Sequence, residues 1–157
     1  MNKKFSTLVA TLLLSGALVS VNATDVKTLA DFKADATTYT VTNMGDSKID
    51  FLADISLDES TPYLLIDQNN LIIDGHGKIF TGRLVITGEN VTVKNLTILN
   101  KTTSNASSYH KNAITVVSSS VTIIDNNIIC DGGVNLLANG ISIFPTDADA
   151  KIVVKGN

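Results

Sequence analysis

The sequence predicts an all-β protein, a parallel β-helix of about four coils with a short N-terminal capping helix. Four stretches repeat one pattern, in which β-branched and polar residues alternate and then meet Asp, Lys, Asn or Gly. They are residues 70–75, 90–95, 120–126 and 150–157. Leading strands near positions 64, 84, 113 and 141 give each coil about 20 to 30 residues. No helical segment separates these short strands, which excludes a β-α-β sheet.

The first 23 residues have the pattern of a secretory signal peptide. Lys3 and Lys4 precede an apolar stretch over residues 8–21, and small residues precede the expected cleavage after Ala23. A single N-terminal membrane anchor is the alternative, but no stop-transfer flank follows. The leader is typical of bacterial export, so we expect a protein that is secreted or held at the cell surface or in the periplasm.

The remaining residues, 24–157, are mildly acidic. Without Lys3 and Lys4 they contain 10 basic residues against 15 acidic ones, a net charge of −5. An acidic chain lacks the basic surface that binds phosphate backbones, so we expect no nucleic-acid partner. Acidic polysaccharides are repelled too, unless a cation bridges them. The single cysteine, Cys130, cannot form an internal disulfide, and its apolar neighbours favour a buried thiol over a reactive one.

Residues 24–36 predict the capping helix. Thr24 is a candidate N-cap, Asp25 suits the positive end of a helix, and apolar residues recur at helical spacing from Val26 to Phe32. Such a helix would cover the first coil, whose exposed strand edge would otherwise invite pairing with other chains.

Residues 37–157 predict the β-helix. From Thr38 the apolar period falls to two, which indicates strands on either side of a turn at 43–48. The later strands group into coils: 63–66, 71–74 and 78–80; 84–87, 91–94 and 96–99; 113–117, 121–124 and 128–130; then 140–144 and 151–155. Gly75, Asn95, Asn126 and Gly156 or Asn157 are predicted at equivalent bends. Gly and Asn tolerate left-handed backbone, and stacked Asn side chains can hydrogen-bond along the axis.

Three runs resemble the right-handed parallel β-helix superfamily typified by pectate lyases and polygalacturonases, the pectin lyase-like fold. They are Ile73-Asp74-Gly75, residues 91–98 and residues 113–128. The resemblance extends from about Tyr63 to the C-terminus and implies the right-handed coil. It says little about activity, because such runs form the core and bends of any coil of this kind.

The resemblance raises a catalytic interpretation that the rest of the sequence does not favour. Members that cleave pectic chains carry either an Asp-rich calcium site with an arginine or several catalytic Asp residues, and neither set is assembled here. Gly75-His76-Gly77 is similar to a Gly-His-Gly triplet of polygalacturonases. The Asn-Thr-Asp, Asp-Asp and Arg-Ile-Lys elements that accompany it there are absent, so we interpret His76 as a turn residue in solvent.

Two further groups of residues are candidate ligand sites. Asp67, Asp74 and Asp125 would offer oxygen ligands to calcium if they converged, but no motif supports this, and we predict no cofactor. The polar insertion at 100–112 presents Tyr109, His110 and Lys111, which offer a stacking face, a titratable donor and a cation to a polysaccharide. We favour a solvated loop over this binding site, because Ser, Thr and Asn dominate the insertion.

The sequence ends inside a repeat, since the strand at 151–155 and the bend at 156–157 are not followed by a third strand. An uncapped last coil would favour self-association. We expect a secreted or cell-surface β-helix module that is non-catalytic and contacts polysaccharide. The alternatives are a fragment or minimal form of a polysaccharide lyase or glycoside hydrolase, dependent on Arg83 or a metal, and an adhesin unit that assembles end to end.

Overall fold

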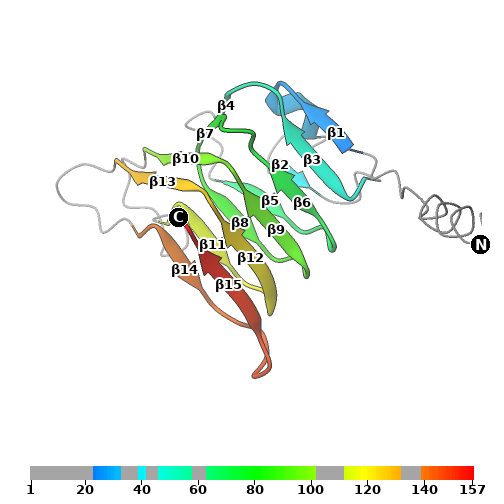
Figure 1. Cartoon of the computed structure of the whole chain (residues 1–157), viewed down its shortest axis with the longest axis vertical. Coiled ribbons are helices and arrows are strands. Elements are labelled where there is room, and N and C mark those ends of the chain that lie inside the picture. The colour runs from blue at the N-terminus through cyan, green and yellow to red at the C-terminus, as the bar shows by residue number, and fades with distance from the viewer. Residues whose placement is uncertain (1–22, 33–38, 42–45, 58–62, 102–111, 132–138) are drawn as a thin grey trace, which may run out of the picture.

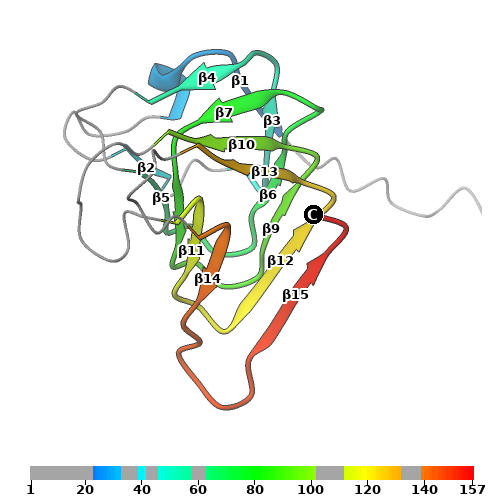
Figure 2. The same cartoon turned by 90° about the vertical axis from the view of Figure 1, so that its left-hand side faces the viewer.

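The computed structural model describes residues 23–32, 39–41, 46–57, 63–101, 112–131 and 139–157. Over these ranges the chain forms a parallel β-solenoid in which three sheets enclose one interior (Figures 1 and 2). All the strand pairs described are parallel. The prediction of an all-β parallel β-helix of about four coils is confirmed.

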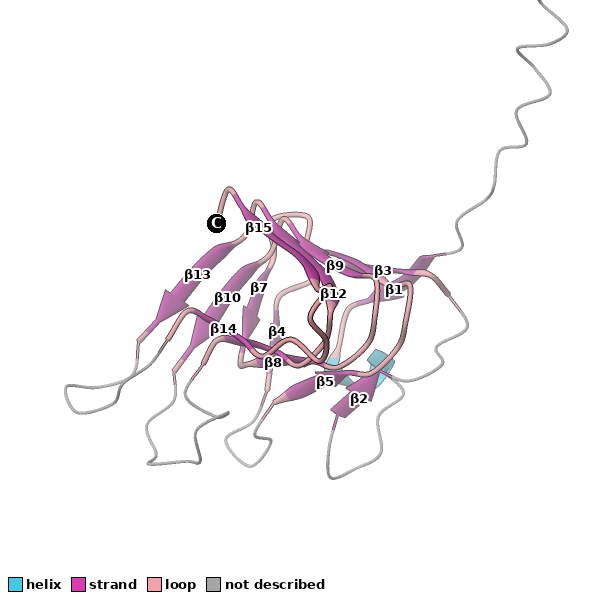
Figure 3. Ribbon diagram, turned by 90° about the horizontal axis from the view of Figure 1, so that it is seen from below, coloured by secondary structure: helices cyan, strands magenta, loops and turns pink. Residues whose placement is uncertain are grey.

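Each sheet collects one strand from each coil. The six-stranded sheet consists of β1 (Ala23–Val26), β3 (Lys48–Phe51), β6 (Ile72–Asp74), β9 (Val91–Lys94), β12 (Ser120–Ile124) and β15 (Lys151–Lys155). The five-stranded sheet consists of β2 (Tyr39–Val41), β5 (Leu64–Ile66), β8 (Leu84–Ile86), β11 (Ile114–Val116) and β14 (Ile141–Ile143). The four-stranded sheet consists of β4 (Ile55–Ser56), β7 (Ile79–Thr81), β10 (Thr97–Asn100) and β13 (Asn127–Cys130). Four complete coils therefore run from β2 to β13, with β1 before them and β14 and β15 after them (Figure 3).

The N-terminal cap differs from the predicted helix. Ala23–Val26 forms β1, which pairs with β3, and only Leu29–Phe32 is helical, as a single 3-10 turn, η1. Pairing with the free edge of β3 buries Val26 completely, and the Asp31 carboxylate accepts hydrogen bonds from the backbone N–H groups of Lys27 and Thr28 at 2.9 and 2.7 Å. The edge of β3 thus overrides the local helical period. Among the described residues no helix is long and apolar enough to cross a membrane, and residues 1–22 of the expected signal peptide lie outside them.

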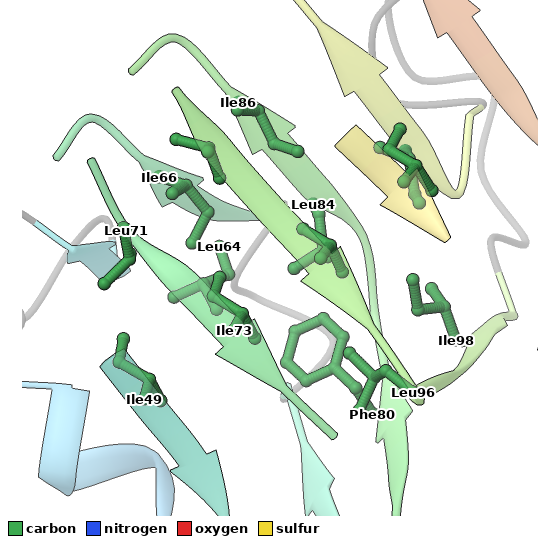
Figure 4. Close-up of a cluster of buried hydrophobic side chains, with 14 of the residues drawn as sticks. Ile49, Leu64, Ile66, Leu71, Ile73, Phe80, Leu84, Ile86, Leu96 and Ile98 are labelled. Carbon is green, nitrogen blue, oxygen red and sulfur yellow. The ribbon is translucent and has the colours of Figure 1, made fainter. Parts of the chain in front are cut away.

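The core consists of rows of aliphatic side chains that repeat from coil to coil. Ile49, Ile73, Val93 and Ile123 are successive register partners in the six-stranded sheet, and each is at most 1% exposed. Figure 4 shows Ile49 and Ile73 facing the side chains of the other two sheets across the interior. Burial of each such side chain contributes about 1.5 to 3 kcal/mol. The alternation of apolar and polar residues is therefore what closes the coil.

At the bends after the six-stranded sheet, one residue in each of the last three coils has a left-handed backbone conformation. In one of these coils that residue is one position earlier than predicted. Asn95, Asp125 and Gly156 each follow aligned strand ends and have φ values of 55°, 55° and 68°. Asn126, which was expected beside Asn95, lies one residue later and follows the left-handed Asp125. The register explains the error, because Ile124 pairs with Lys94, so the next residue on each strand begins the bend.

Asn126 instead forms the polar centre of an asparagine ladder inside the corner. It is 4% exposed, and its amide donates to the backbone carbonyls of Val93 and Ile124 and to Asn157 Oδ1 at 2.9 to 3.0 Å. Its own Oδ1 accepts from the Leu96 backbone N–H at 3.1 Å. Stacked Asn side chains thus hydrogen-bond along the axis between Asn126 and Asn157, whereas Asn95 donates to Asp74. The Asn126 contacts satisfy backbone groups that the bend leaves without partners.

We predict that Gly75→Ala strongly destabilises the fold. A Cβ at position 75 would lie 2.5 Å from both the carbonyl oxygen of Asn95 and the Cα of Leu96, so the next coil would have to move. Overpacking against backbone should cost about 3 kcal/mol, which lowers Tm by roughly 6 to 12 °C in a domain of this size. Thermal unfolding followed by circular dichroism measures the change. Gly140→Ala is the matched control, because its Cβ would make an ordinary contact at 3.6 Å with Ile128; equal Tm values for the two variants would contradict the close packing of this bend.

Candidate functional site

The candidate site lies on the outer face of the six-stranded sheet and at the bends that follow it. Asp50, Asp74 and Lys94 are successive register partners at the ends of β3, β6 and β9. The residues just before them, Ile49, Ile73 and Val93, are buried, so this row projects to the opposite, outer face. The repeat therefore stacks charged side chains of both signs about 4.8 Å apart along the axis.

The connection between β6 and β7 brings His76 to this row. Four residues, 75–78, separate Asp74 from Ile79, whereas two residues separate the aligned strands in each of the next two coils. The longer connection turns through His76 and Gly77, which have φ values of 48° and 75°. It carries the imidazole back across the sheet, so that Nε2 lies 2.6 Å from Asp50 Oδ1.

The row is cross-linked by ion pairs and hydrogen bonds. Lys48 Nζ lies 2.7 Å from Asp50 Oδ1, and Lys94 Nζ lies 2.9 Å from Asp74 Oδ2. The Asn95 amide donates to Asp74 Oδ1 at 3.0 Å, and His76 Nδ1 is 3.8 Å from the same oxygen. Each carboxylate thus has its own lysine, and the imidazole lies between the two carboxylates.

These contacts hold both carboxyl groups in their charged form. Burial would raise the pKa of Asp74, but hydrogen bonds from Asn95, Lys94 and the His76 backbone N–H lower it to about 2. Burial likewise opposes ionisation of Asp50, yet hydrogen bonds from Lys48 and His76 lower its pKa. The pKa of Lys48 is raised in turn by its hydrogen bond to Asp50. Fixed charge, and not a shared proton, is what this arrangement provides.

The geometry bears on two kinds of chemistry, metal binding and glycoside hydrolysis. One ligand atom from each of Asp50, Asp74 and His76 lies within 4.8 Å of the others, a spacing that a metal ion could bridge. A cation would first have to displace the ammonium groups of Lys48 and Lys94, which already neutralise both carboxylates. Glycoside hydrolysis needs one carboxyl group whose pKa is raised, so that it can protonate the leaving oxygen. Both pKa values here are shifted in the opposite direction.

A shallow depression of about 400 Å³ lies directly beside His76, at the corner between the six-stranded and four-stranded sheets. It is lined by His76, Gly77, Asn95, Leu96, Thr97, Asp125 and Asn127. The long connection after β6 protrudes where the two following bends are shorter, and this step in the surface forms one wall. Thr97 and Asn127 are direct register partners on β10 and β13, so their side chains lie about 5 Å apart on one face.

The predicted calcium ligands are not brought together. Asp67 follows β5 and accepts a hydrogen bond from Thr87 Oγ1 at 2.8 Å, whereas Asp74 lies at the far end of β6. Asp125 follows β12, two strands beyond Asp74. Arg83, the arginine of the lyase alternative, lies between β7 and β8, and burial lowers its pKa.

The other predicted ligand residues, Tyr109, His110 and Lys111, lie outside the described residues. Their insertion leaves the chain after Asn100 at the C-terminal end of β10, whereas the depression lies at the opposite end of that strand, beside Thr97.

Sequence reasoning missed Asp50, Lys48 and Lys94 as parts of the site. A usable signal was present, since the runs at 48–51, 72–75 and 92–95 align as Lys-Ile-Asp-Phe, Ile-Ile-Asp-Gly and Thr-Val-Lys-Asn. Stacking these runs places Asp, Asp and Lys in one outward row. The role of His76 depends on the length of the connection after β6, which the repeat pattern alone does not define.

No family model matches the chain, and neither a curated protein nor a solved structure does. A solenoid of this kind supports many unrelated functions, so function depends on the side chains of the site.

We predict that Asp74→Asn removes an acid-sensitive part of the stability. Because the pKa of Asp74 is lowered from 3.8 to about 2 on folding, its carboxylate stabilises the fold above pH ~4, and this contribution disappears as the pH falls through 3.8 toward 2. The shift corresponds to about 2 kcal/mol at neutral pH. Urea unfolding at a series of pH values should show a variant that is weaker than wild type near neutrality and converges with it near pH 2.

Asp149→Asn provides the control for this experiment. Asp149 is exposed in the turn before β15, and the substitution removes the same formal charge. Its stability profile should follow that of wild type. An Asp74→Asn variant that remained parallel to wild type at all pH values would contradict the role of the Lys94 and Asn95 contacts.

Proposed function

We propose that this chain is an exported β-helix module that contacts polysaccharide, without cleaving it, through the depression beside His76. The observation that carries the proposal is the set of polar groups at its surface. The Thr97 hydroxyl, the Asn127 amide and the Asp125 carboxylate all line the depression, and none has a side-chain partner among the described residues. Hydroxyl, amide and carboxylate groups are those that exchange hydrogen bonds with sugar hydroxyls.

The rigidity of the surrounding coil supports binding at this place. Thr97 and Asn127 are held on paired strands, and Asn95 is fixed by its hydrogen bond to Asp74. A ligand that contacts them therefore orders few protein side chains on binding. A shallow, elongated repeat surface also suits a chain-like ligand better than a small enclosed one.

The electrostatics support a binding role in preference to cleavage. The carboxylates of Asp50 and Asp74 are ionised and paired with lysines, so neither is suited to donate a proton to a leaving group. Their cross-links also hold His76 as a wall of the depression. We propose that Tyr109, His110 and Lys111 supply a separate contact to the same polymer.

We predict that Thr97→Val weakens glycan binding. The substitution keeps the β-branched shape and removes one hydroxyl, so affinity should fall about fivefold, the equivalent of one lost hydrogen bond of ~1 kcal/mol. Binding is measured by titration calorimetry of the full chain against neutral, amino-substituted and uronate oligosaccharides. Tyr109→Ala, measured on the same panel, tests whether the insertion contributes.

Thr92→Val is the matched control for Thr97→Val. Thr92 has the same outward orientation on β9 but lies outside the depression, so its substitution should leave affinity unchanged. Equal affinities for wild type and Thr97→Val would remove the depression from the proposal, and a lack of binding to the whole panel would overturn the proposal itself.

End-to-end assembly is a second candidate, favoured by the outer edge of β15. Val153 and Val154 on this strand are 48% and 45% exposed. Register pairing links Asp25 on β1 to Lys155 on β15 through one continuous row. A second copy that added its β1 to β15 in the same register would place Asp25 of one copy opposite Lys155 of the other.

We predict for this second candidate that Lys155→Glu shifts a self-association equilibrium toward monomer by placing like charges opposite each other. Sedimentation velocity over a range of protein concentrations measures the shift. Lys101→Glu, which makes the same charge change away from β15, should leave association unaltered. A wild-type chain that remains monomeric at all concentrations would reject assembly by this edge.

A further inference from the structure

We infer that the depression beside His76 selects sugars that carry no acidic group and prefers those with a free amine, with Asp125 as the residue that imposes the choice. This inference rests on the proposed glycan-binding function and specifies the class of ligand. It differs from the uronate polymers that the sequence resemblance would suggest.

Charge compensation distinguishes Asp125 from the other carboxylates of this surface. Asp50 and Asp74 each have a lysine within 3 Å, whereas no described side chain pairs with Asp125. Asp125 is exposed and lines the depression. Within the described chain it is therefore the one lining residue whose carboxylate lies outside any ion pair.

Lys94 and His76, two of the basic residues near the depression, already have partners. Lys94 Nζ is held at 2.9 Å from Asp74, and His76 Nε2 is held at 2.6 Å from Asp50. Lys94 cannot turn toward a ligand carboxylate without leaving Asp74 uncompensated, which costs free energy at this buried position, and His76 would give up its contact with Asp50. A uronate bound here would face Asp125, and neither Lys94 nor His76 would be free to act as its counter-charge.

The position of Asp125 is fixed by the backbone of the bend. Its φ of 55° is shared by Asn95 in the previous coil, and in the next coil the left-handed residue is Gly156. A side chain at position 156 would collide with the Asp125 carboxylate, so this glycine leaves the space that the carboxylate occupies. The backbone of the bend thus sets the direction in which the Asp125 side chain leaves the coil, and Gly156 leaves room for its carboxylate.

The chemistry that fits these groups is a donor-rich sugar. A carboxylate accepts hydrogen bonds from hydroxyl groups and forms a stronger, charge-assisted bond with an ammonium group. Thr97 and Asn127 complete the contact with groups that both donate and accept. Affinity should therefore decrease from amino sugar to neutral sugar to uronate.

The experiment compares three oligosaccharides of equal length, namely glucosamine, glucose and galacturonate oligomers, against wild type and Asp125→Asn. Asparagine is nearly isosteric with aspartate and tolerates the left-handed backbone, so the fold should be retained. Titration calorimetry at mildly acidic pH, where the sugar amine is protonated, should show that Asp125→Asn binds glucosamine oligomers about tenfold more weakly. Its affinity for glucose oligomers should change less than about twofold, and binding of galacturonate oligomers should improve. Asp149→Asn, with the same charge change in the turn before β15, should behave as wild type.

Ionic strength provides a second readout. Raising it from about 0.1 M to 1 M shortens the screening length from ~10 to ~3 Å, so binding of glucosamine oligomers should weaken for wild type and not for Asp125→Asn. Binding of galacturonate oligomers as strong as that of glucosamine oligomers, and sensitive to Thr97→Val, would overturn the inference while leaving the proposed function in place. Failure of all three oligomers to bind would overturn both.

Discussion

Parallel pairing in unbroken register is the constraint on which the rest of this structure depends. Each strand of the six-stranded sheet lies directly above its counterpart, so a residue type that recurs in the repeat becomes a continuous row. Inward rows join into the aliphatic core, and outward rows place side chains about 4.8 Å apart along the axis. A shift of one residue would move the whole row to the other face, so burial of Ile73 and Val93 also fixes Asp74 and Lys94 outside.

The greater length of the bend after β6 then creates the candidate site on an otherwise regular coil. Two extra residues after β6 give the chain room to turn through His76 and Gly77, while the following two bends keep the short connection. The long bend produces both the contact between His76 and Asp50 and the step that bounds the depression. Core packing is undisturbed, because Phe80 returns to the interior on β7 and is fully buried.

The interior of the fold was predictable from sequence because it depends on a local alternation. The period-two pattern located nearly all strands of the later coils to within one or two residues, including those around Val91 and Val121. The bend row was predicted one residue off at Asn126, because alignment of bends requires the register, which the pattern of Asn and Gly does not contain. The predicted helix at 24–36 failed for a related reason, since a helical period of a few residues is weak against the open edge of β3.

The candidate site was harder to predict because its contacts join residues from different coils. His76 and Asp50 are 26 positions apart, and their contact depends on the register of β3 with β6 and on the length of one bend. In the sequence, His76 stands out only as part of a triplet that resembles a catalytic one. The expectation that it is a turn residue agrees with its positive φ. The sequence could not show that this turn places the His76 imidazole against Asp50, a member of the charged row.

Compensation of charge along that row links stability to recognition. Asp50 and Asp74 are close enough to repel each other, and Lys48 and Lys94 remove this repulsion, which lets the imidazole of His76 lie between them. The row is interrupted just before Asp125, because Ile124 lies between Lys94 of the previous coil and Lys155 of the next. Ion pairs along the row thus stabilise the coil, and the selectivity that we propose for the depression depends on the one lining carboxylate that these pairs leave out.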